Sequence, residues 1–362
     1  MSIWDLHGPS KFISNIEEGL RANRAGVVIF PMHRPVGFSA SIVERLGRQG
    51  WFLNPLDWIE GEYPLNFLFQ QLAVPIEPNE RQSVALLCDR LGSILIVVDD
   101  IQQRDWPEWK RFLMEYELEL RRRGNERVPL LLCVLCGVEK EMAVIHAPAI
   151  SVYPWAGVVT ELDTHIFIRS QSLNIDRPTI EKDISSRIIA KLSLWDIDLA
   201  AKLLKVDIKD LTSPHITLRE LASERKWVRG DSCCWSMGTE DSFEGRTARH
   251  SLWLAVNDGG DELEFRVWSA QASVGLLLVE QRRREIAPRA ARYLRLPVEV
   301  EGEWVSNVQD LEIGQLAHLL ILKRCPDMDL MRRVKLLKRV RNALAHVKVV
   351  EPALLFDTDL LG

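Results

Sequence analysis

The sequence predicts an α/β doubly wound parallel sheet in the amino-terminal part of the chain, followed by helices up to the carboxyl terminus. Residues 94–98 are all aliphatic, so a strand formed by them has no polar face and must be covered on both sides. Short apolar segments of this kind alternate with helical patterns across residues 1–157, which is typical of a parallel sheet. From Thr160 onward strand patterns largely disappear, and helical patterns dominate.

The composition indicates a soluble protein of two or three domains, because 362 residues are more than one ordinary hydrophobic core holds. The net charge of -5 gives no general attraction to nucleic acid, so any such contact must come from a local patch. No apolar run approaches the length of a membrane span, and no basic start precedes an apolar stretch. We therefore expect a cytoplasmic protein that makes no membrane contact.

The six cysteines predict neither disulfides nor a metal site. Cys133 and Cys136 fall in one predicted strand, where an offset of three residues places them on opposite faces. Cys233 and Cys234 are adjacent in the sequence, and no second pair lies at zinc-site spacing. We expect reduced structural thiols and no bound metal.

The elements of the predicted sheet follow one another closely. Apolar residues at helical spacing predict a helix over 13–24, which Gly26 ends. A short buried strand follows over 26–30, and a helix runs from Ser39 or Ala40 to Leu46. The other predicted elements are strands at 51–57, 94–100, 128–136 and 149–153, and helices at 66–73, 79–91 and 106–123.

The second half of the chain is predicted to be mainly helical. Glycine-rich residues 226–261 are expected to form loops in which only 251–256 looks packed. Amphipathic patterns near the carboxyl terminus predict an antiparallel helical bundle. The predicted helices are 162–168, 178–192 and 195–205, and in the bundle 262–284, 313–323 and 329–347.

Two acidic residues, Asp99 and Asp100, stand at the carboxyl end of the buried strand at 94–100. Open parallel sheets place their ligand crevice at this edge, so both carboxylates are candidate binding groups. The alternative is that they only cap the next helix, which starts between residues 102 and 107.

The loop between the strand at 26–30 and the next helix stands where a phosphate-binding loop belongs. In the pattern G-x-x-x-x-G-K-[ST], Gly37 and Ser39 match, whereas Met32 and Phe38 replace the first glycine and the lysine. The missing lysine removes a contact to phosphate worth about 1.5–3 kcal/mol, so we predict little or no ATP hydrolysis. Arg34 and His33 offer compensating positive charge, although the segment is also interpretable as an ordinary proline-rich surface turn.

Together these two segments resemble a degenerate P-loop NTPase of the STAND/AAA+ type, and the strand with Asp99 resembles its Walker B strand. The resemblance implies that Asp99 would hold Mg²⁺ and Asp100 would polarise the attacking water in an active member. It makes Gly37, Ser39, Asp99 and Asp100 a degenerate cofactor-binding site. It also implies that the strand at 128–136 takes the place of a sensor strand and that a helical lid follows the sheet.

The last predicted helix contains the segment Arg341-Asn-Ala-Leu-Ala-His346. This segment resembles the R-N-x-x-x-H signature of HEPN domains, helical bundles of prokaryotic anti-phage systems, many of which are metal-independent endoribonucleases. The resemblance implies that His346 acts as general base or acid, that Arg341 stabilises the charged phosphorane, and that Asn342 orients one of them. RNA-binding residues on the same helix would be Arg332, Lys335, Lys338 and Arg339.

Arg341 and His346 are five positions apart, so roughly 140° separates them around a regular helix. Two copies facing across a two-fold axis, or a break in the helix after Ala345, would bring them to one phosphate. In the structural alternative, Arg341 forms a salt bridge, Asn342 bonds neighbouring backbone and His346 closes the helix at its carboxyl end. His318 is expected to be an ordinary residue of an amphipathic face. His250 beside Ser251 has no acid partner recognisable in the sequence, so we predict no hydrolase triad.

Three functional interpretations follow. The first is a non-hydrolysing sensor, adaptor or assembly subunit of a prokaryotic defence complex, with other proteins as partners and no required cofactor. The second is a HEPN-type endoribonuclease that is a homodimer through its carboxyl-terminal helices. The third is a switch that binds ATP and Mg²⁺ without turnover. The expected division is a degenerate NTPase-like domain at 1–157, a helical lid at 158–212, a connector at 213–261 and a HEPN-like bundle at 262–362.

Overall fold

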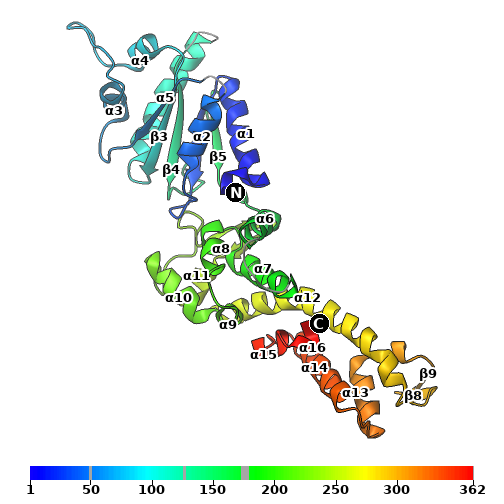
Figure 1. Cartoon of the computed structure of the whole chain (residues 1–362). Coiled ribbons are helices and arrows are strands. Elements are labelled where there is room, and N and C mark those ends of the chain that lie inside the picture. Colours follow the sequence, from blue (N-terminus) through cyan, green and yellow to red (C-terminus); the bar gives the residue numbers. More distant parts are fainter. Residues whose placement is uncertain (49–50, 125–127, 173–178, 362) are drawn as a thin grey trace. The chain divides into compact units, whose positions relative to one another are not determined.

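The computed structural model describes residues 1–48, 51–124, 128–172 and 179–361, which form two compact units (Figure 1). The first unit contains residues 1–167, 195–197 and 231–250. The second contains residues 168–194, 198–230 and 251–362. Each unit is therefore assembled from segments that lie far apart in the sequence.

A five-stranded parallel sheet forms the centre of the first unit and confirms the predicted α/β architecture. Every residue of β1 and β4 is buried, which agrees with their unbroken apolar sequences. The strand order is β2-β3-β4-β1-β5. The strands are β1 (Ala25–Phe30), β2 (Leu53–Asp57), β3 (Leu95–Gln102), β4 (Leu130–Cys136) and β5 (Ile150–Pro154).

Helices cover both faces of this sheet. The connection from β1 to β2 crosses the sheet in one direction, and the connection from β3 to β4 crosses it in the other. Because both connections are expected to be right-handed, the helices in them lie on opposite faces of the sheet. On one face α1 and α2 lie side by side, and Arg45 of α2 binds the buried Glu17 of α1 at 2.5 Å. On the other face α3 and α4 contact α5. The helices are α1 (His7–Arg21), α2 (Phe38–Gly47), α3 (Pro64–Gln71), α4 (Val84–Leu91) and α5 (Trp106–Arg123), with a 3-10 turn at Ile3–Asp5.

The start of helix α4 differs from the sequence prediction, and the start of α5 agrees with it. Helix α4 begins at Val84 rather than near residue 79, because the Ser83 hydroxyl caps it by accepting the N–H of Leu86 at 3.2 Å. Helix α5 begins at Trp106 with Asp105 at its N-cap position, while Asp99 and Asp100 still belong to β3. The alternative that these two acids cap the next helix is therefore wrong.

An antiparallel hairpin in the glycine-rich region was not expected from the sequence. Strands β6 (Glu240–Phe243) and β7 (Arg246–Arg249) belong to the first unit and pair through a turn at Glu244 and Gly245. Both turn residues have positive φ, 52° and 74°, which is typical of a type I′ hairpin. The strands are short and mostly polar, so they lack the alternating apolar pattern that predicts a strand.

The long helix α12 (Gly260–Ala291) is the core element of the second unit and packs against α7, α13 and α14. It continues seven residues beyond the predicted end at Arg284, and Pro288 lies inside it. Helices α7 (Thr179–Ser193), α13 (Ile313–Leu322) and α14 (Met328–Ala345) lie close to their predicted ranges. The remaining elements are α6 (Glu161–Ser172), α8 (Ile197–Leu203), α9 (Ile208–Thr212), α10 (His215–Glu224), α11 (Ser251–Val256), α15 (Pro352–Leu355), α16 (Thr358–Leu361), β8 (Val298–Val300), β9 (Glu303–Val305) and a 3-10 turn at Val308–Asp310.

Candidate functional site

The topology of the sheet makes the carboxyl ends of β1 and β4 the expected ligand position, and we call this position the crevice. These strands are neighbours, but the chain leaves β1 toward β2 and leaves β4 toward β5, in opposite directions across the sheet. Loops that diverge in this way leave a crevice at the carboxyl edge of the sheet, where ligands of open α/β folds bind. The loop after β1 contains Met32, Arg34 and Gly37, and the adjacent β3 carries Asp99.

The structure brings Arg34, Ser39 and Asp99 together at this edge. One oxygen of the Asp99 carboxylate lies 2.5 Å from the Arg34 guanidinium, and the other accepts the hydroxyl of Ser39. The side chains of Arg34 and Asp99 are 23% and 17% exposed, so the pair is shielded from solvent on most sides. Both carboxylate oxygens of Asp99 are therefore bound by the chain itself.

Asp100 lies at the solvent-exposed edge of this cluster, where its carboxylate is 3.9 Å from the Arg34 guanidinium. Its φ of 65° coincides with an irregularity in the pairing of β3 with β4 between Val98 and Ile101. A local bulge of this kind redirects the side chains that follow it. The Asp100 side chain is 59% exposed and accepts the Gln102 amide at 2.8 Å, so it is more open to solvent than Asp99 although both acids contact Arg34.

The positions of the phosphate-loop pattern have structural roles. Gly37 has φ of 86° and occupies the N-cap of α2, so its glycine is required by backbone conformation. Phe38, at the lysine position, is 2% exposed. Its ring lies 5.0 Å from that of Phe30 and 5.5 Å from that of Trp4, in a cluster that also includes Phe12. A side chain at this position is directed into the core and not toward the crevice.

The crevice itself is covered by residues 233–239, which sequence reasoning missed. The Met32 N–H donates to the Ser236 carbonyl at 2.7 Å, and the Ser236 hydroxyl donates to Glu139 in the loop after β4. Lys140 of the same loop lies 4.9 Å from the centre of the buried Trp235 ring. We call these contacts the crevice cover. Nothing in the sequence connects residues 233–239 with a loop two hundred positions earlier.

Burial changes the proton affinity of two groups beside the crevice. It raises the pKa of the Cys136 thiol to about 12, which keeps this cysteine neutral and unreactive. It also raises the pKa of Asp241 to about 7, while hydrogen bonds from the N–H groups of Ser242 and Gly157 act in the opposite direction. Asp241 is 5% exposed and joins the β6–β7 hairpin to the segment after β5.

The HEPN-like motif lies at the end of α14 in the second unit. The helix ends at Ala345, and His346 follows it as an exposed C-cap residue whose N–H donates to the Asn342 carbonyl at 3.0 Å, which matches the structural alternative in which His346 closes the helix. The Arg341 guanidinium lies 3.1 Å from the carboxylate of Glu312, which the sequence did not indicate as a partner. Trp268 of α12 fixes this end of the helix, because its indole N–H donates to the Leu344 carbonyl at 2.8 Å.

The predicted RNA-binding residues differ in their contacts. Arg332 is held by the carboxylates of Asp329 and Asp359, with a distance of 2.5 Å to the latter. Lys335 and Arg339 are exposed and have no ion pair within the described residues. With Asn342 and His346 they follow the spacing of one helix face, and Lys338 lies beside it.

The remaining histidines are placed as follows. His318 is exposed on α13. His250 is 1% exposed, and its Nε2 lies 2.8 Å from the carboxylate of Asp196, an acid partner that the sequence did not reveal. The hydroxyl of Ser251 instead accepts a hydrogen bond from Arg266 at 2.7 Å. These residues therefore form no nucleophilic triad.

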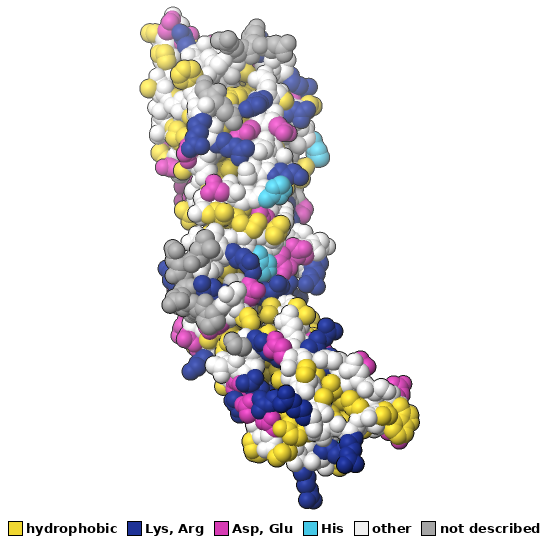
Figure 2. Space-filling view, turned by 45° about the vertical axis from the view of Figure 1, so that its right-hand side comes forward, with side chains coloured by type: hydrophobic (Ala, Val, Ile, Leu, Met, Phe, Trp, Pro, Cys, Tyr) yellow, Lys and Arg dark blue, Asp and Glu magenta, His cyan; other side chains and the backbone are white. Residues whose placement is uncertain are grey.

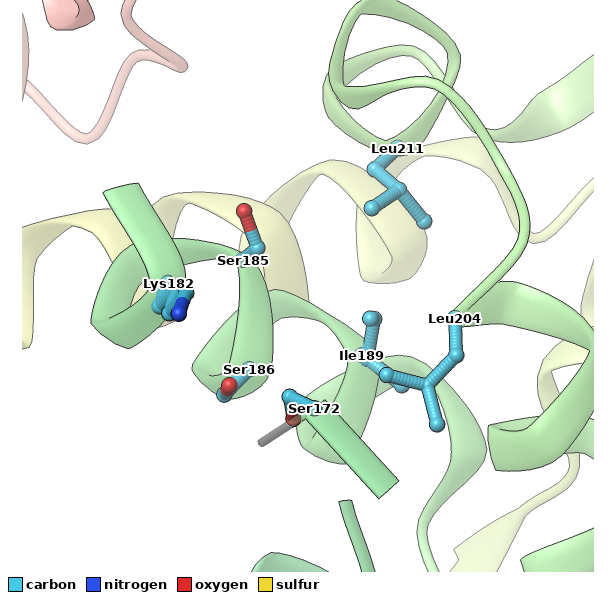
Figure 3. A pocket seen from close by; sticks show the side chains of 7 residues that line it. All are labelled: Ser172, Lys182, Ser185, Ser186, Ile189, Leu204 and Leu211. Atoms are coloured by element: carbon cyan, nitrogen blue, oxygen red, sulfur yellow. The ribbon is translucent and has the colours of Figure 1, made fainter. Parts of the chain in front are cut away.

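A small cavity in the second unit is lined partly by α7 (Figure 3). Its empty volume is about 310 Å³ and includes space open to solvent. The Ser185 hydroxyl donates to the Glu181 carbonyl at 2.7 Å, and the Ser172 hydroxyl donates to that of Ile168. These two hydroxyl groups of the cavity lining are thus already hydrogen-bonded within their own helices, and we assign no ligand to the cavity. The lining residues are Ser172, Lys182, Ser185, Ser186, Ile189, Leu204 and Leu211.

The described residues form neither a metal-binding cluster nor a membrane-spanning helix. They contain no group of three or more His, Cys, Asp or Glu side chains arranged to hold a metal ion. None of the helices formed by these residues combines the length and the apolar composition required to cross a bilayer.

Comparisons with known proteins give no family assignment. No family model matches the chain, and no curated protein sequence is similar to it. A solved structure, a chain of the E. coli MS115-1 HORMA:CdnC:Trip13 complex, shares 13% sequence identity with this chain. The similarity covers 59% of this chain and 80% of that chain, with a TM-score of 0.27. A likeness this distant carries no argument about function.

Proposed function

We propose that this chain is a non-hydrolysing sensor, adaptor or assembly subunit of a prokaryotic defence complex that acts through contacts with other proteins. The observation that carries the proposal is the occupied Asp99 carboxylate. In active P-loop enzymes a carboxylate and a hydroxyl at these positions hold Mg²⁺. Here Arg34 binds the Asp99 carboxylate and Ser39 donates to it, so an internal cation takes the place of the metal.

Two further contacts support the absence of turnover. Phe38 occupies the lysine position within a buried aromatic cluster, so no cation extends from there toward a phosphate. The Met32 N–H, which a phosphate-binding loop would offer to its ligand, is already bound to the Ser236 carbonyl. The defence setting rests on the resemblance of the sequence to STAND, AAA+ and HEPN proteins.

The lack of hydrolysis is tested by measuring phosphate release from Mg²⁺-ATP by the purified chain, together with calorimetric titration of the nucleotide. We expect no release above background and no binding at millimolar ATP, both for the natural chain and for Arg34→Ala. Arg48→Ala, which removes an exposed i,i+4 ion pair, is the matched control. Phosphate release that requires Mg²⁺ and disappears in Asp99→Asn would contradict the proposal.

The assembly role is tested by affinity purification of the tagged chain from cells that also express its genomic neighbours, during phage infection. We expect specific co-purifying proteins and protection of the cells against phage. Protection should persist in Asp99→Asn, because no metal-dependent step is involved. A chain that protects cells only when Asp99 is intact, or that retains no partner under these conditions, is not an adaptor of this kind.

A second candidate function is a metal-independent endoribonuclease built on a HEPN-like bundle at residues 262–362. The exposed position of His346 at the C-cap of α14 favours it, because the imidazole is open to a phosphate that reaches this end of the helix. Lys335 and Arg339, which have no ion pair within the described residues, supply positive charge along the same helix for an RNA backbone.

This function is tested with single-stranded RNA in the presence of a chelator. Replacing a general acid or base typically lowers the rate about 100-fold or more, so His346→Ala and Arg341→Ala should each abolish cleavage. The exposed Lys348→Ala is the control and should retain it. Cleavage that survives both substitutions, or that the chelator removes, would come from another site or a contaminant.

A further inference from the structure

The β8–β9 hairpin of the second unit is partly buried on the side of Val298, Val300 and Val305 and exposed on the opposite side. Its two strands pair only with each other and form a separate two-stranded sheet. A two-stranded ribbon is marginally stable in water unless another surface packs against it. Trp304 is nevertheless 69% exposed, on the face that it shares with its cross-strand neighbour Glu299. An exposed tryptophan on the open side of such a hairpin indicates a surface that a partner covers.

The charge of this hairpin restricts the choice of partner. Glu299, Glu301 and Glu303 are all exposed and form no ion pair within the described part of the chain. Residues 296–308 contain no lysine or arginine. Glu299 lies on the same side of the ribbon as Trp304 and Glu301 is in the turn, and we call Glu299, Glu301 and Trp304 the acidic hairpin face. Its net negative charge disfavours nucleic acid and anionic lipid and favours a positively charged protein surface.

A surface of that kind exists on the same unit, at the connection between α13 and α14. Ile321, Leu322 and Met328 are 54%, 64% and 77% exposed there. Lys323 and Arg324 lie between them, are exposed and have no ion pair among the described residues. We call these five residues the basic tip. Figure 2 shows basic side chains at the lowest point of this unit and hydrophobic side chains with acidic ones beside them at its right-hand end.

We propose that the acidic hairpin face of one copy of the chain binds the basic tip of a second copy. Each surface combines exposed apolar groups with unpaired charges, and the charges are opposite in sign. Arg324 can stack on the Trp304 ring while Lys323 meets the glutamates. Because every copy carries both surfaces, a two-fold axis generates two such contacts and doubles the buried area. The inference is independent of the nucleotide and RNA proposals.

The test is sedimentation velocity of the full chain at micromolar concentration, with three charge or side-chain variants. The natural chain should be a dimer. Trp304→Ala should weaken dimerisation about 30-fold, as loss of a central aromatic anchor does. Glu299→Lys/Glu301→Lys and Lys323→Glu/Arg324→Glu should each be monomeric, because each places like charges opposite one another. All substituted residues are exposed, and circular dichroism checks that the variants remain folded.

Mixing the two charge-reversed chains gives the decisive measurement. In the mixed dimer, the positively charged hairpin of one variant faces the negatively charged tip of the other. The second contact joins a natural acidic hairpin to a natural basic tip. Both contacts therefore pair opposite charges, and a heterodimer should form. Glu264→Lys and Lys205→Glu, exposed and without ion pairs in the described residues, are matched controls that should remain dimeric. A monomeric natural chain, variants that still dimerise, or a mixture that stays monomeric would each overturn the proposal.

Discussion

At the scale of single residues, the surroundings of a side chain decide its chemistry. Asp99 and Asp100 are adjacent and identical in type, yet Asp99 is enclosed by Arg34 and Ser39, whereas Asp100 is 59% exposed and reaches Arg34 only at 3.9 Å. Asp241 is enclosed so completely that burial raises its pKa to about 7. Its local sequence, between Glu240 and Ser242, gives no sign of this.

Asp241→Asn should remove a pH dependence of stability. The pKa of Asp241 is 3.8 in its ordinary state and about 7 in the fold, so between these values only the folded chain holds the proton. The contribution is therefore fully present below about pH 4 and is lost as the pH rises toward 7. Each tenfold change in proton affinity is worth about 1.4 kcal/mol, so the loss is at most about 4 kcal/mol.

The measurement is urea unfolding at pH 5, 6, 7 and 8, with the variant expected to be the more stable chain at pH 8. The exposed Asp57→Asn in the same unit is the control and should leave the pH profile unchanged. Identical profiles for Asp241→Asn and the natural chain would show that Asp241 titrates normally.

Restoring the lysine of the phosphate-loop pattern should not restore nucleotide binding. Phe38→Lys removes the ring contacts with Trp4, Phe12 and Phe30 and buries a charge, so we expect a loss of about 3–5 kcal/mol in the free energy of unfolding. Chemical denaturation and ATP titration measure the two effects. Ala40→Lys, exposed on the same helix, is the control for an added charge. A stable Phe38→Lys variant that binds ATP would contradict the structural role of Phe38.

At the scale of elements, the apolar pattern of the sequence predicted the strands that are buried on both faces. It did not predict elements that are held by turns and single polar contacts. Strands β1 and β4 are buried on both faces, so their sequences alone identified them. Hairpin β6–β7 is held by its turn and by the Asp241 contact to Gly157, neither of which produces a periodic signal. Helix α12 continues through Pro288, beyond the predicted end, where neighbouring elements continue to cover its buried face.

The packing of α12 on α14 depends on a close approach at Gly275. A Cβ atom at this position would lie 2.8 Å from a methyl group of Leu344. Gly275→Val should therefore force the helices apart and lower the free energy of unfolding by about 1–3 kcal/mol. Adding Leu344→Ala to this variant removes the methyl group that obstructs the valine. The double variant should therefore regain part of the free energy of unfolding lost in Gly275→Val, and a double-mutant cycle measures this coupling.

Gly314→Ala on α13 is the matched control for this substitution. It meets no atom within 4 Å and should stabilise the chain by up to about 1 kcal/mol, because alanine favours the helix. A stable Gly275→Val variant with no coupling to Leu344→Ala would show that the two helices are not in contact there.

At the scale of the whole molecule, the chain passes repeatedly between its two units. Residues 231–250 complete the sheet unit from a distant part of the sequence, and they supply the crevice cover and the buried Phe243. A fragment of residues 1–167 lacks all of these contacts. We expect it to unfold without a cooperative transition, whereas the full chain unfolds cooperatively.

Circular dichroism during heating compares the two chains, and addition of a peptide spanning residues 229–252 is the complementary test. Recovery of a cooperative transition with the peptide, and not with a scrambled one, would confirm that this segment completes the unit. A fragment 1–167 as cooperative as the full chain would show that the crevice cover contributes little to folding.

The sequence by itself determined the parallel sheet, its order of strands and helices along the chain, and the phenylalanine at the position where the phosphate-loop pattern has a lysine. These features depend on local patterns of apolar residues and on single residue types, which are visible without coordinates. It also located Ser39 and Asp99 as candidates, but not their contact with each other or with Arg34. The pairing of Arg34 with Asp99, the closure of the crevice by Ser236 and the pairing of Arg341 with Glu312 were decided only by the tertiary structure. Each joins residues distant in the chain, and no local pattern encodes which distant groups the packed core brings within hydrogen-bonding distance.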